Sequence, residues 1–188
     1  EAGCRNIQLD DCTWGMMADK SGHFAYGTTQ EGLIEIQKAH KDINNKVIAN
    51  APKDIVINTH VCRGNFHSTY ANSGAYDPVA DILFGEENVD AYYLEFDDER
   101  SGGFAPLAKV SGDKKVVLGL ITTKSPKLEN KEEVINRIHE AEKYIPLDRL
   151  YLSPQCGFAS CEIGNKLTAE EQWAKLKFVK EIAEEVWG

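Results

Sequence analysis

Short apolar segments alternate with helical patterns along the chain, and this alternation constrains the fold more than any other feature. The apolar segments have the length and the aliphatic or aromatic composition of buried parallel strands. They are Arg5 to Asp10, Asp54 to His60, Asp90 to Phe96, Lys115 to Ile121 and Arg149 to Ser153. Repeated strand–helix–strand units predict a parallel sheet with right-handed crossovers, which is either a doubly wound sheet or a β/α barrel.

Three stretches between and after these segments have helical periodicity. Apolar residues recur every three or four positions from Gln30 to Ile48 and from Lys131 to Tyr144, which predicts crossover helices. The last helix is expected to start after Thr168, because Thr168 and Glu171 form a capping-box pattern. The connections 62–90 and 96–115 are rich in Gly, Asn, Ser and Asp, so we expect long loops with short helices there. No linker between domains is visible in the sequence.

Polar or reactive side chains follow every predicted strand, which favours the barrel. Active sites of β/α barrels gather at the C-terminal ends of several strands. No Gly-rich phosphate loop follows the first strand, which argues against a nucleotide-binding doubly wound sheet. We therefore predict a (β/α)8 TIM barrel of which this chain supplies the C-terminal five strands. Residues 1–188 would then form the C-terminal part of a single catalytic barrel, with three strands upstream.

Charge and hydropathy narrow the range of partners. The formal net charge is -9, and no basic block offsets it, so we expect neither nucleic acid nor an anionic membrane as a partner. No apolar run approaches the roughly 20 residues that span a bilayer, and we expect a cytoplasmic protein. Five cysteines, an odd and irregularly spaced set, indicate reduced thiols rather than a disulfide framework.

Four of the residues at strand ends form a plausible metal-ligand set. His60 and Cys62 are two positions apart, so their side chains leave a strand on the same face. Glu95 and Cys156 stand at equivalent ends of other predicted strands. One imidazole, two thiolates and one carboxylate suit tetrahedral zinc. The simpler alternative is a hydrogen-bonded histidine beside a buried structural thiol.

The same motifs resemble a known family. The tracts Thr59-His60-Val61-Cys62, Leu94-Glu95 and Pro154 to Phe158, following Gln8-Leu9-Asp10, resemble the C-terminal catalytic barrel of cobalamin-independent methionine synthases. The single-barrel bacterial homologues are more similar, because they also carry a tract like Thr122 to Pro126. The resemblance covers essentially the whole chain in one order. It implies zinc on His60, Cys62, Glu95 and Cys156, homocysteine sulfur as the methyl acceptor, and Asp10 as the partner of the substrate's amino group.

The ligand chemistry agrees with this implication. Two thiolates and a carboxylate exceed the charge of Zn²⁺, so the ion would be a poor activator of water, but it would still hold a substrate thiol as its thiolate. We therefore predict a zinc-dependent methyltransferase that methylates homocysteine, or a similar thiol, in methionine synthesis. The alternatives are a noncatalytic barrel with a structural zinc site, and a related methyltransferase with another acceptor or a corrinoid donor.

Two departures from the family leave the methyl donor open between folate and other carriers. Where the two-domain synthases have a histidine thought to protonate the departing folate, this chain has Lys124. Lys124 is a candidate proton donor or anion binder, and otherwise a solvated loop lysine. The family's folate-binding carboxylate beyond the first strand has no counterpart in residues 12–16. Nothing in the sequence indicates the oligomeric state.

Other residues near the predicted site have weaker claims. Asp11 is expected to cap the segment after the first strand rather than to bind substrate. The run from Asp97 to Arg100 is either a substrate-orienting cluster or, as we favour, a solvated loop. Cys12 is a competing metal ligand, whereas Cys4 and Cys161 are expected to be buried, inert thiols.

Overall fold

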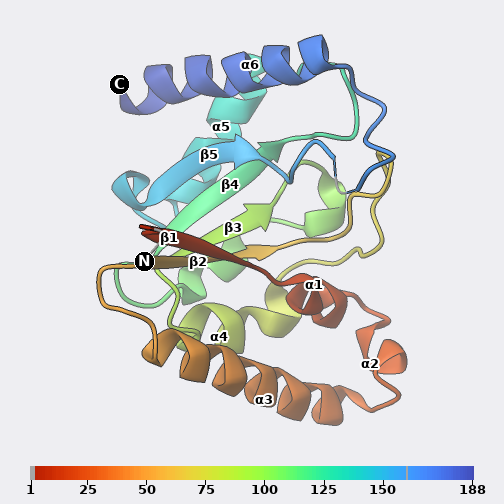
Figure 1. Ribbon diagram of the computed structural model, residues 1–188, viewed down its shortest axis with the longest axis vertical. Helices are drawn as coiled ribbons and strands as arrows, with labels where there is room; N and C mark the ends of the chain where they lie inside the picture. The colour runs from red at the N-terminus through yellow and green to blue at the C-terminus, as the bar shows by residue number, and fades with distance from the viewer. Residues whose placement is uncertain (1–2, 160) are drawn as a thin grey trace.

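A computed structural model describes residues 3–159 and 161–188 (Figure 1). Its centre is one parallel sheet whose strands neighbour one another in chain order, β1-β2-β3-β4-β5. The strands are β1 Asn6–Asp10, β2 Val56–Val61, β3 Ala91–Glu95, β4 Lys115–Ile121 and β5 Leu150–Pro154. Each predicted strand is confirmed to within two residues at either end. The predicted α/β class with five parallel strands is therefore correct.

The helices agree with the three predicted from periodicity and add three more. The helices are α1 Cys12–Ala18, α2 Gly22–Ala25, α3 Gln30–Ala49, α4 Asp77–Glu86, α5 Lys131–Glu142 and α6 Ala169–Trp187. Short 3-10 helices span Glu99–Ser101, Ala105–Lys109 and Leu147–Arg149. The capping box at the start of α6 is present, with Thr168 and Glu171 bonded in both directions. Among the described residues, no helix is long and apolar enough to cross a membrane.

Helix α4 is the largest difference from the sequence-based expectation for the loop 62–90. It runs for ten residues and buries five of them, which are Val79, Ala80, Ile82, Leu83 and Phe84. It packs against α1, α3 and the 3-10 helix at 105–109, so it has apolar neighbours on several sides. A helix buried in this way has a nearly continuous apolar sequence, and the 3.6-residue period that reveals amphipathic helices is weak.

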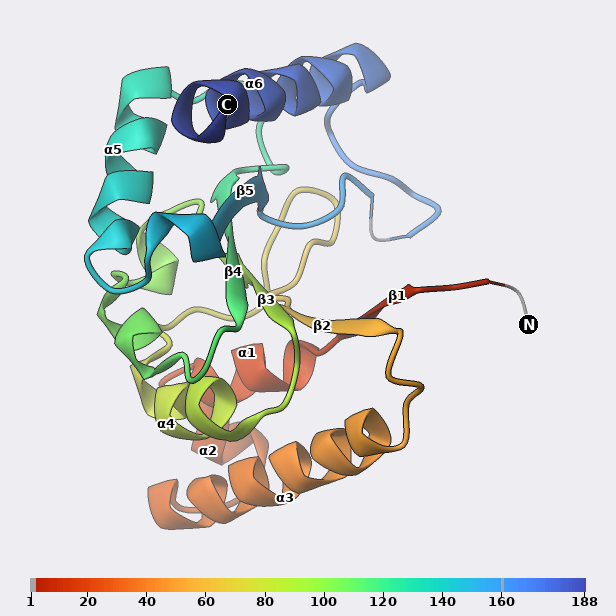
Figure 2. The same ribbon diagram turned by 90° about the vertical axis from the view of Figure 1, so that its left-hand side faces the viewer.

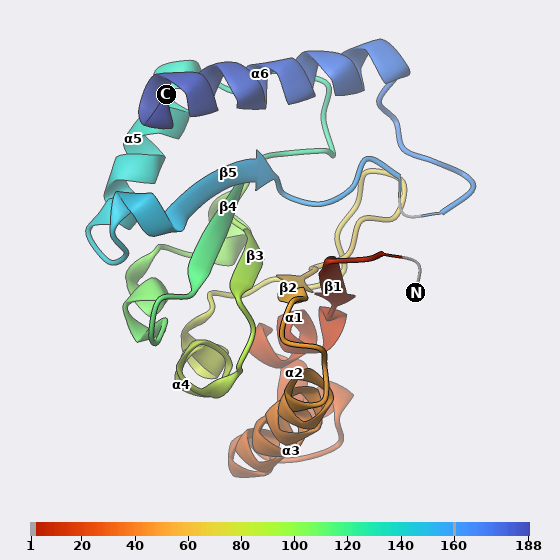
Figure 3. The ribbon, with the colours of Figure 1, turned by 60° about the vertical axis from the view of Figure 1, so that its left-hand side comes forward.

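The strands form an arc, with the helices along its outer side (Figures 2 and 3). The core includes Leu94 and Leu118 on the helix-covered face of the sheet, and Val79 and Ile138 from the helices. A hollow of about 340 Å³ on the other face is lined by side chains that include Asn58, Tyr93 and Tyr151. Sequential strand order with helices along one side is the arrangement of a β/α barrel wall, whereas a doubly wound sheet reverses its strand order and covers both faces.

Candidate metal centre

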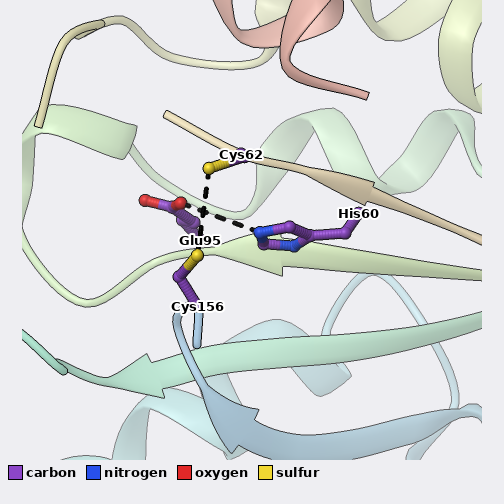
Figure 4. A group of neighbouring side chains, drawn as sticks. All are labelled: His60, Cys62, Glu95 and Cys156. Atoms are coloured by element: carbon purple, nitrogen blue, oxygen red, sulfur yellow. Dashed lines mark hydrogen bonds and ion pairs between the residues drawn. The ribbon is translucent and has the colours of Figure 1, made fainter. Parts of the chain in front are cut away.

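The four predicted ligands meet at one point (Figure 4). His60 Nε2 or Nδ1, the Cys62 and Cys156 sulfurs and a Glu95 carboxylate oxygen all lie within 4.8 Å of one another. His60 lies near the end of β2, Cys62 directly follows that strand, Glu95 ends β3, and Cys156 follows β5 by two residues. Parallel pairing places these strand ends along the same edge of the sheet, which is why residues far apart in sequence converge.

The orientation of His60 leaves one ring nitrogen available inside the cluster. His60 Nδ1 lies 3.2 Å from the carbonyl oxygen of Tyr93, and only a protonated nitrogen forms a hydrogen bond with a carbonyl. The proton on Nδ1 leaves a lone pair on Nε2, which is 4.0 Å from Glu95 Oε1. His60 Nε2 is buried and has no hydrogen-bond partner among the residues that the structure describes. A buried nitrogen without a partner, aimed at two thiols and a carboxylate, fits the role of a metal ligand.

The two cysteines interact directly. The Cys62 and Cys156 sulfurs are 3.8 Å apart. The hydrogen bond between the two sulfurs, and next the nearby His60 ring, lowers the pKa of Cys62, while the same sulfur–sulfur bond and burial raise the pKa of Cys156. Burial alone would lower the pKa of His60, but the proximity and charge of Cys62 outweigh it and raise the pKa. The pair therefore holds one thiolate readily and a second only when a cation replaces the shared proton.

Glu95 is held on both of its oxygens. Its side chain is fully buried, Oε1 accepts a hydrogen bond of 3.0 Å from the Arg63 backbone N–H, and Oε2 accepts one of 2.9 Å from Arg100 Nη2. The Tyr76 hydroxyl bonds to both the backbone N–H and the carbonyl of Glu95. Burial raises the pKa of Glu95, and the Arg63 bond opposes that rise. The carboxylate is therefore fixed in position by the protein itself.

A glycine allows the strands that carry Glu95 and Cys156 to approach closely. A Cβ atom on Gly119 of β4 would lie 2.7 Å from Gln155 Cα and 2.8 Å from the Leu94 carbonyl oxygen. Both contacts are with backbone atoms next to a candidate ligand. The register of β4 and β5 also shifts after Gly119. Only glycine fits the gap where the ends of β3, β4 and β5 come together.

A network of side-chain bonds, which the sequence did not reveal, connects the loops that follow β2, β4 and β5. The Thr123 hydroxyl donates to Gln155 Oε1 at 2.6 Å, and the Thr123 N–H donates to the same oxygen at 3.2 Å. Asn65 Nδ2 donates to the Gly157 carbonyl at 2.5 Å. Asn65, Thr123 and Gln155 are all buried. Each lies within three residues of a predicted site residue, and that proximity is the sequence feature that could have pointed to these three residues.

The two remaining predicted site residues lie next to the four ligands. Asp10 Oδ1 is 4.0 Å from His60 Nε2, and the Asp10 side chain is 68% exposed, so it stands at the rim of the centre. Lys124 Nζ is buried and has no hydrogen-bond partner within residues 3–159 and 161–188. Its charge acts on the Glu95 carboxyl and opposes the rise of that group's pKa. The ammonium of Lys124 is therefore not that of a solvated loop lysine.

A cavity of about 210 Å³ adjoins the cluster on the concave side of the sheet. His60 and Cys156 form part of its wall, so two of the candidate ligands are reached from it. Its other lining residues are Gln8, Tyr93, Leu94, Ser153, Pro154, Gln155 and Gly157. The size suits a small molecule such as an amino acid rather than an extended cofactor.

Three cysteines lie outside the four-residue group, and two of them contradict the expectation of buried thiols. Cys4 and Cys161 are both exposed. Cys4 precedes the first strand of the sheet, and Cys161 lies in the long β5–α6 connection, where neighbouring elements do not cover them. Cys12 is exposed as a residue, but its thiol is partly surrounded by protein, and this partial burial, followed by the charge of Cys62, raises its pKa to about 12. Cys12 is thus near Cys62 without belonging to the group of four.

Asp11 caps a helix, as expected, and belongs to a second polar cluster. Its carboxylate accepts a bond from the Thr13 N–H at the start of α1. It also bonds to His40 Nε2 at 2.7 Å and to Asn44 Nδ2 at 3.0 Å, both from α3. Asn44 Nδ2 in turn lies 2.6 Å from Glu87 Oε1. The cluster attaches the start of α1, next to Asp10, to α3 and to the end of α4.

Comparisons with known proteins agree with this architecture. The family model of the cobalamin-independent synthase catalytic domain matches residues 1–185. Among curated proteins, the uncharacterized protein YxjG of Bacillus subtilis is 49% identical over 191 residues, which cover all of this chain and 50% of YxjG. A 5-methyltetrahydropteroyltriglutamate–homocysteine methyltransferase of Bacillus licheniformis is 30% identical over 134 residues, which cover 70% of this chain and 15% of that protein.

A solved structure gives the same result. A protein from Listeria monocytogenes, assigned as a vitamin-B12-independent methionine synthase, matches with a TM-score of 0.76 and 40% identity, covering 100% of this chain and 50% of that one. The chain thus spans about half the length of the curated relative YxjG and of this structure. It forms part of a barrel of the kind that the sequence predicts. On the family model and these matches, the chain belongs to the cobalamin-independent methionine synthase family, within its catalytic domain.

Proposed function

We propose that this chain carries the zinc centre of a methyltransferase that methylates the thiol of homocysteine or of a similar small amino-acid thiol. Residues 1–188 would form the C-terminal part of one catalytic barrel. The observation that supports this most strongly is the meeting of His60, Cys62, Glu95 and Cys156 within 4.8 Å at the strand ends. Membership of the family supports the reaction class.

The spacing of the donor atoms suits zinc. Two sulfurs at the usual Zn–S distance of about 2.3 Å from a tetrahedral ion would be about 3.8 Å apart. The Cys62 and Cys156 sulfurs are 3.8 Å apart. The separation of 4.0 Å between His60 Nε2 and Glu95 Oε1 exceeds the roughly 3.4 Å expected for nitrogen and oxygen ligands. Binding therefore requires that these two side chains approach one another by about half an ångström.

When bound, zinc would hold the substrate sulfur as a thiolate, which is the nucleophile for attack on a methyl carbon. The residues around it serve binding and orientation. The cavity reaches His60 and Cys156, so a thiol that enters it arrives beside the ligands. Asp10, at the exposed rim, would bind the ammonium group of an amino-acid substrate. The burial of Glu95 and Cys62 excludes water from the inner side of the centre.

The methyl donor is the least constrained component. Lys124 stands where the two-domain synthases have a histidine, and its buried ammonium lacks a partner among the described residues. We propose that Lys124 binds an anionic group of the donor or gives a proton to the leaving group. This substitution also supports the alternative of a related methyltransferase with another acceptor or a corrinoid donor. A purely structural zinc site is the noncatalytic alternative, which the open cavity beside the ligands disfavours.

The test uses the intact protein. It should bind about one zinc, and saturating homocysteine should add a sulfur to the zinc coordination seen by X-ray absorption. Unchanged coordination at saturating thiol would refute the catalytic role. Cys62→Ser and Cys156→Ser should each lose zinc, while Cys4→Ser, at an exposed cysteine outside the group, should retain it. Zinc loss in Cys4→Ser would show that the ligands are misassigned. A screen of folate and corrinoid methyl donors would then identify the donor.

A further inference from the structure

We propose that Arg100 is a positioning residue of the metal centre, which restricts Glu95 to binding the metal through a single oxygen. The inference rests on the proposed zinc site and deepens it. It assigns a role to the Asp97 to Arg100 segment, which the proposed reaction leaves without one. The solvated loop expected from sequence is found only at Asp98 and Glu99, which are exposed, whereas the Asp97 and Arg100 side chains are 1% and 5% exposed.

The two oxygens of Glu95 have different surroundings. Oε1 lies 4.0 Å from His60 Nε2 and is therefore the oxygen that faces the other ligands. It accepts one hydrogen bond, from the Arg63 N–H, and a carboxylate oxygen has a second lone pair for a metal. Oε2 accepts a hydrogen bond of 2.9 Å from Arg100 Nη2. A metal that bound both oxygens would have to displace this charge-assisted hydrogen bond.

Arg100 is itself held firmly. Its Nη2 also bonds to Asp97 Oδ1 at 2.8 Å, and its Nη1 bonds to Asp98. The guanidinium carbon lies 4.7 Å from the centre of the Tyr70 ring. The Asp98 side chain caps the 3-10 helix by accepting the Arg100 backbone N–H at 2.9 Å. One planar group thus joins three carboxylates, and the point charge of a lysine does not reproduce that geometry.

A consequence for coordination follows. A carboxylate with two free oxygens often chelates a metal, which raises the coordination number. With Oε2 occupied, Glu95 supplies one donor atom, and His60, Cys62 and Cys156 supply the other three. The guanidinium also offsets part of the negative charge of two thiolates and a carboxylate. Arg100 therefore favours four-coordinate zinc over ions that prefer more ligands.

The experiment uses Co²⁺ in place of zinc in the intact protein, because four-coordinate Co²⁺ absorbs visible light more strongly than five-coordinate Co²⁺. The variants are Arg100→Met and Arg100→Lys. The matched control is Arg137→Met, because Arg137 is a half-buried arginine that bonds to the Phe96 carbonyl and packs on Phe104 without contacting Glu95. Circular dichroism checks that each variant is folded.

Wild type and Arg137→Met should show the intense four-coordinate bands. Arg100→Met should lose intensity as the coordination number rises, and its Zn²⁺ affinity should fall by roughly ten- to hundredfold. Arg100→Lys should be intermediate, and it decides the matter if Arg100→Met does not fold. Wild-type bands in the folded Arg100 variants, or equal changes in Arg137→Met, would overturn the inference. A wild-type protein that binds neither Co²⁺ nor Zn²⁺ would instead refute the proposed metal site.

Discussion

Glu87 should make the stability of this protein depend on pH. Its side chain is fully buried at the end of α4, where Asn44 Nδ2 donates a hydrogen bond to Oε1. Its Oε2 has no hydrogen-bond partner within the described part of the chain. Burial raises the pKa of Glu87 from 4.5 to about 7, against the lowering effect of the Asn44 bond. The folded protein therefore holds this proton more tightly than the unfolded chain.

The sign and size of the effect follow from proton linkage. Between pH 4.5 and about 7 the folded state binds more protons than the unfolded state, so the free energy of unfolding falls as the pH rises. A shift of about 2.5 pKa units corresponds to about 3 kcal/mol. The full contribution is present below pH 4.5 and is lost as the pH rises through the folded pKa of about 7.

Urea unfolding of wild type and Glu87→Gln at pH 5 and pH 8 measures this contribution. The wild type should lose about 2.5 kcal/mol more than the variant between the two pH values, because part of the full contribution is already lost at pH 5. The hydrogen bond with Asp11 raises the pKa of His40, which also reduces stability as the pH rises, but His40 is present in both proteins and largely cancels in the difference. If the difference between the two proteins is the same at pH 5 and pH 8, Glu87 is ionised throughout and the reasoning is wrong.

Two further substitutions test the close approach of strands beside the candidate metal centre and a buried ion pair elsewhere in the fold. Gly119→Ala should lower Zn²⁺ affinity by roughly tenfold in a chelator competition, because the added Cβ would push against the backbone beside Cys156. Gly85→Ala, where an added Cβ meets open space, should keep the wild-type affinity. Equal affinities in the wild type and both variants would contradict the close approach at Gly119. Lys175→Met should lower the free energy of unfolding in urea by about 3 kcal/mol, because the fully buried Lys175 pairs with Glu129 at 3.0 Å. The control is Lys177→Met, at an exposed lysine of the same helix. A loss of stability no larger than the control's would show that the buried pair contributes little.

The strands could be predicted from local apolar patterns, and the convergence of the four candidate ligands from their places at strand ends. The apolar run from Lys115 to Ile121 is confirmed as β4 without change, and the His60–Cys62 spacing placed two candidate ligands at one strand end. Short helices were expected in the connection 62–90, but the position and length of α4 were not predicted, because its near-continuous burial weakens the helical period. The Arg100–Glu95 contact depends on how a loop folds back on its strand, and the Thr123–Gln155 bond joins two loops 32 residues apart. Such contacts leave no local pattern in one sequence.

The candidate ligands lie on neighbouring elements from β2 to β5, and this has an evolutionary consequence. All four candidate ligands are encoded in one uninterrupted stretch between His60 and Cys156. A recombination or duplication event that exchanged sequence upstream of this stretch would leave the metal centre intact. Exchange of the upstream sequence alone could therefore change residues at the rim of the site, such as Asp10, without changing any of the four candidate ligands.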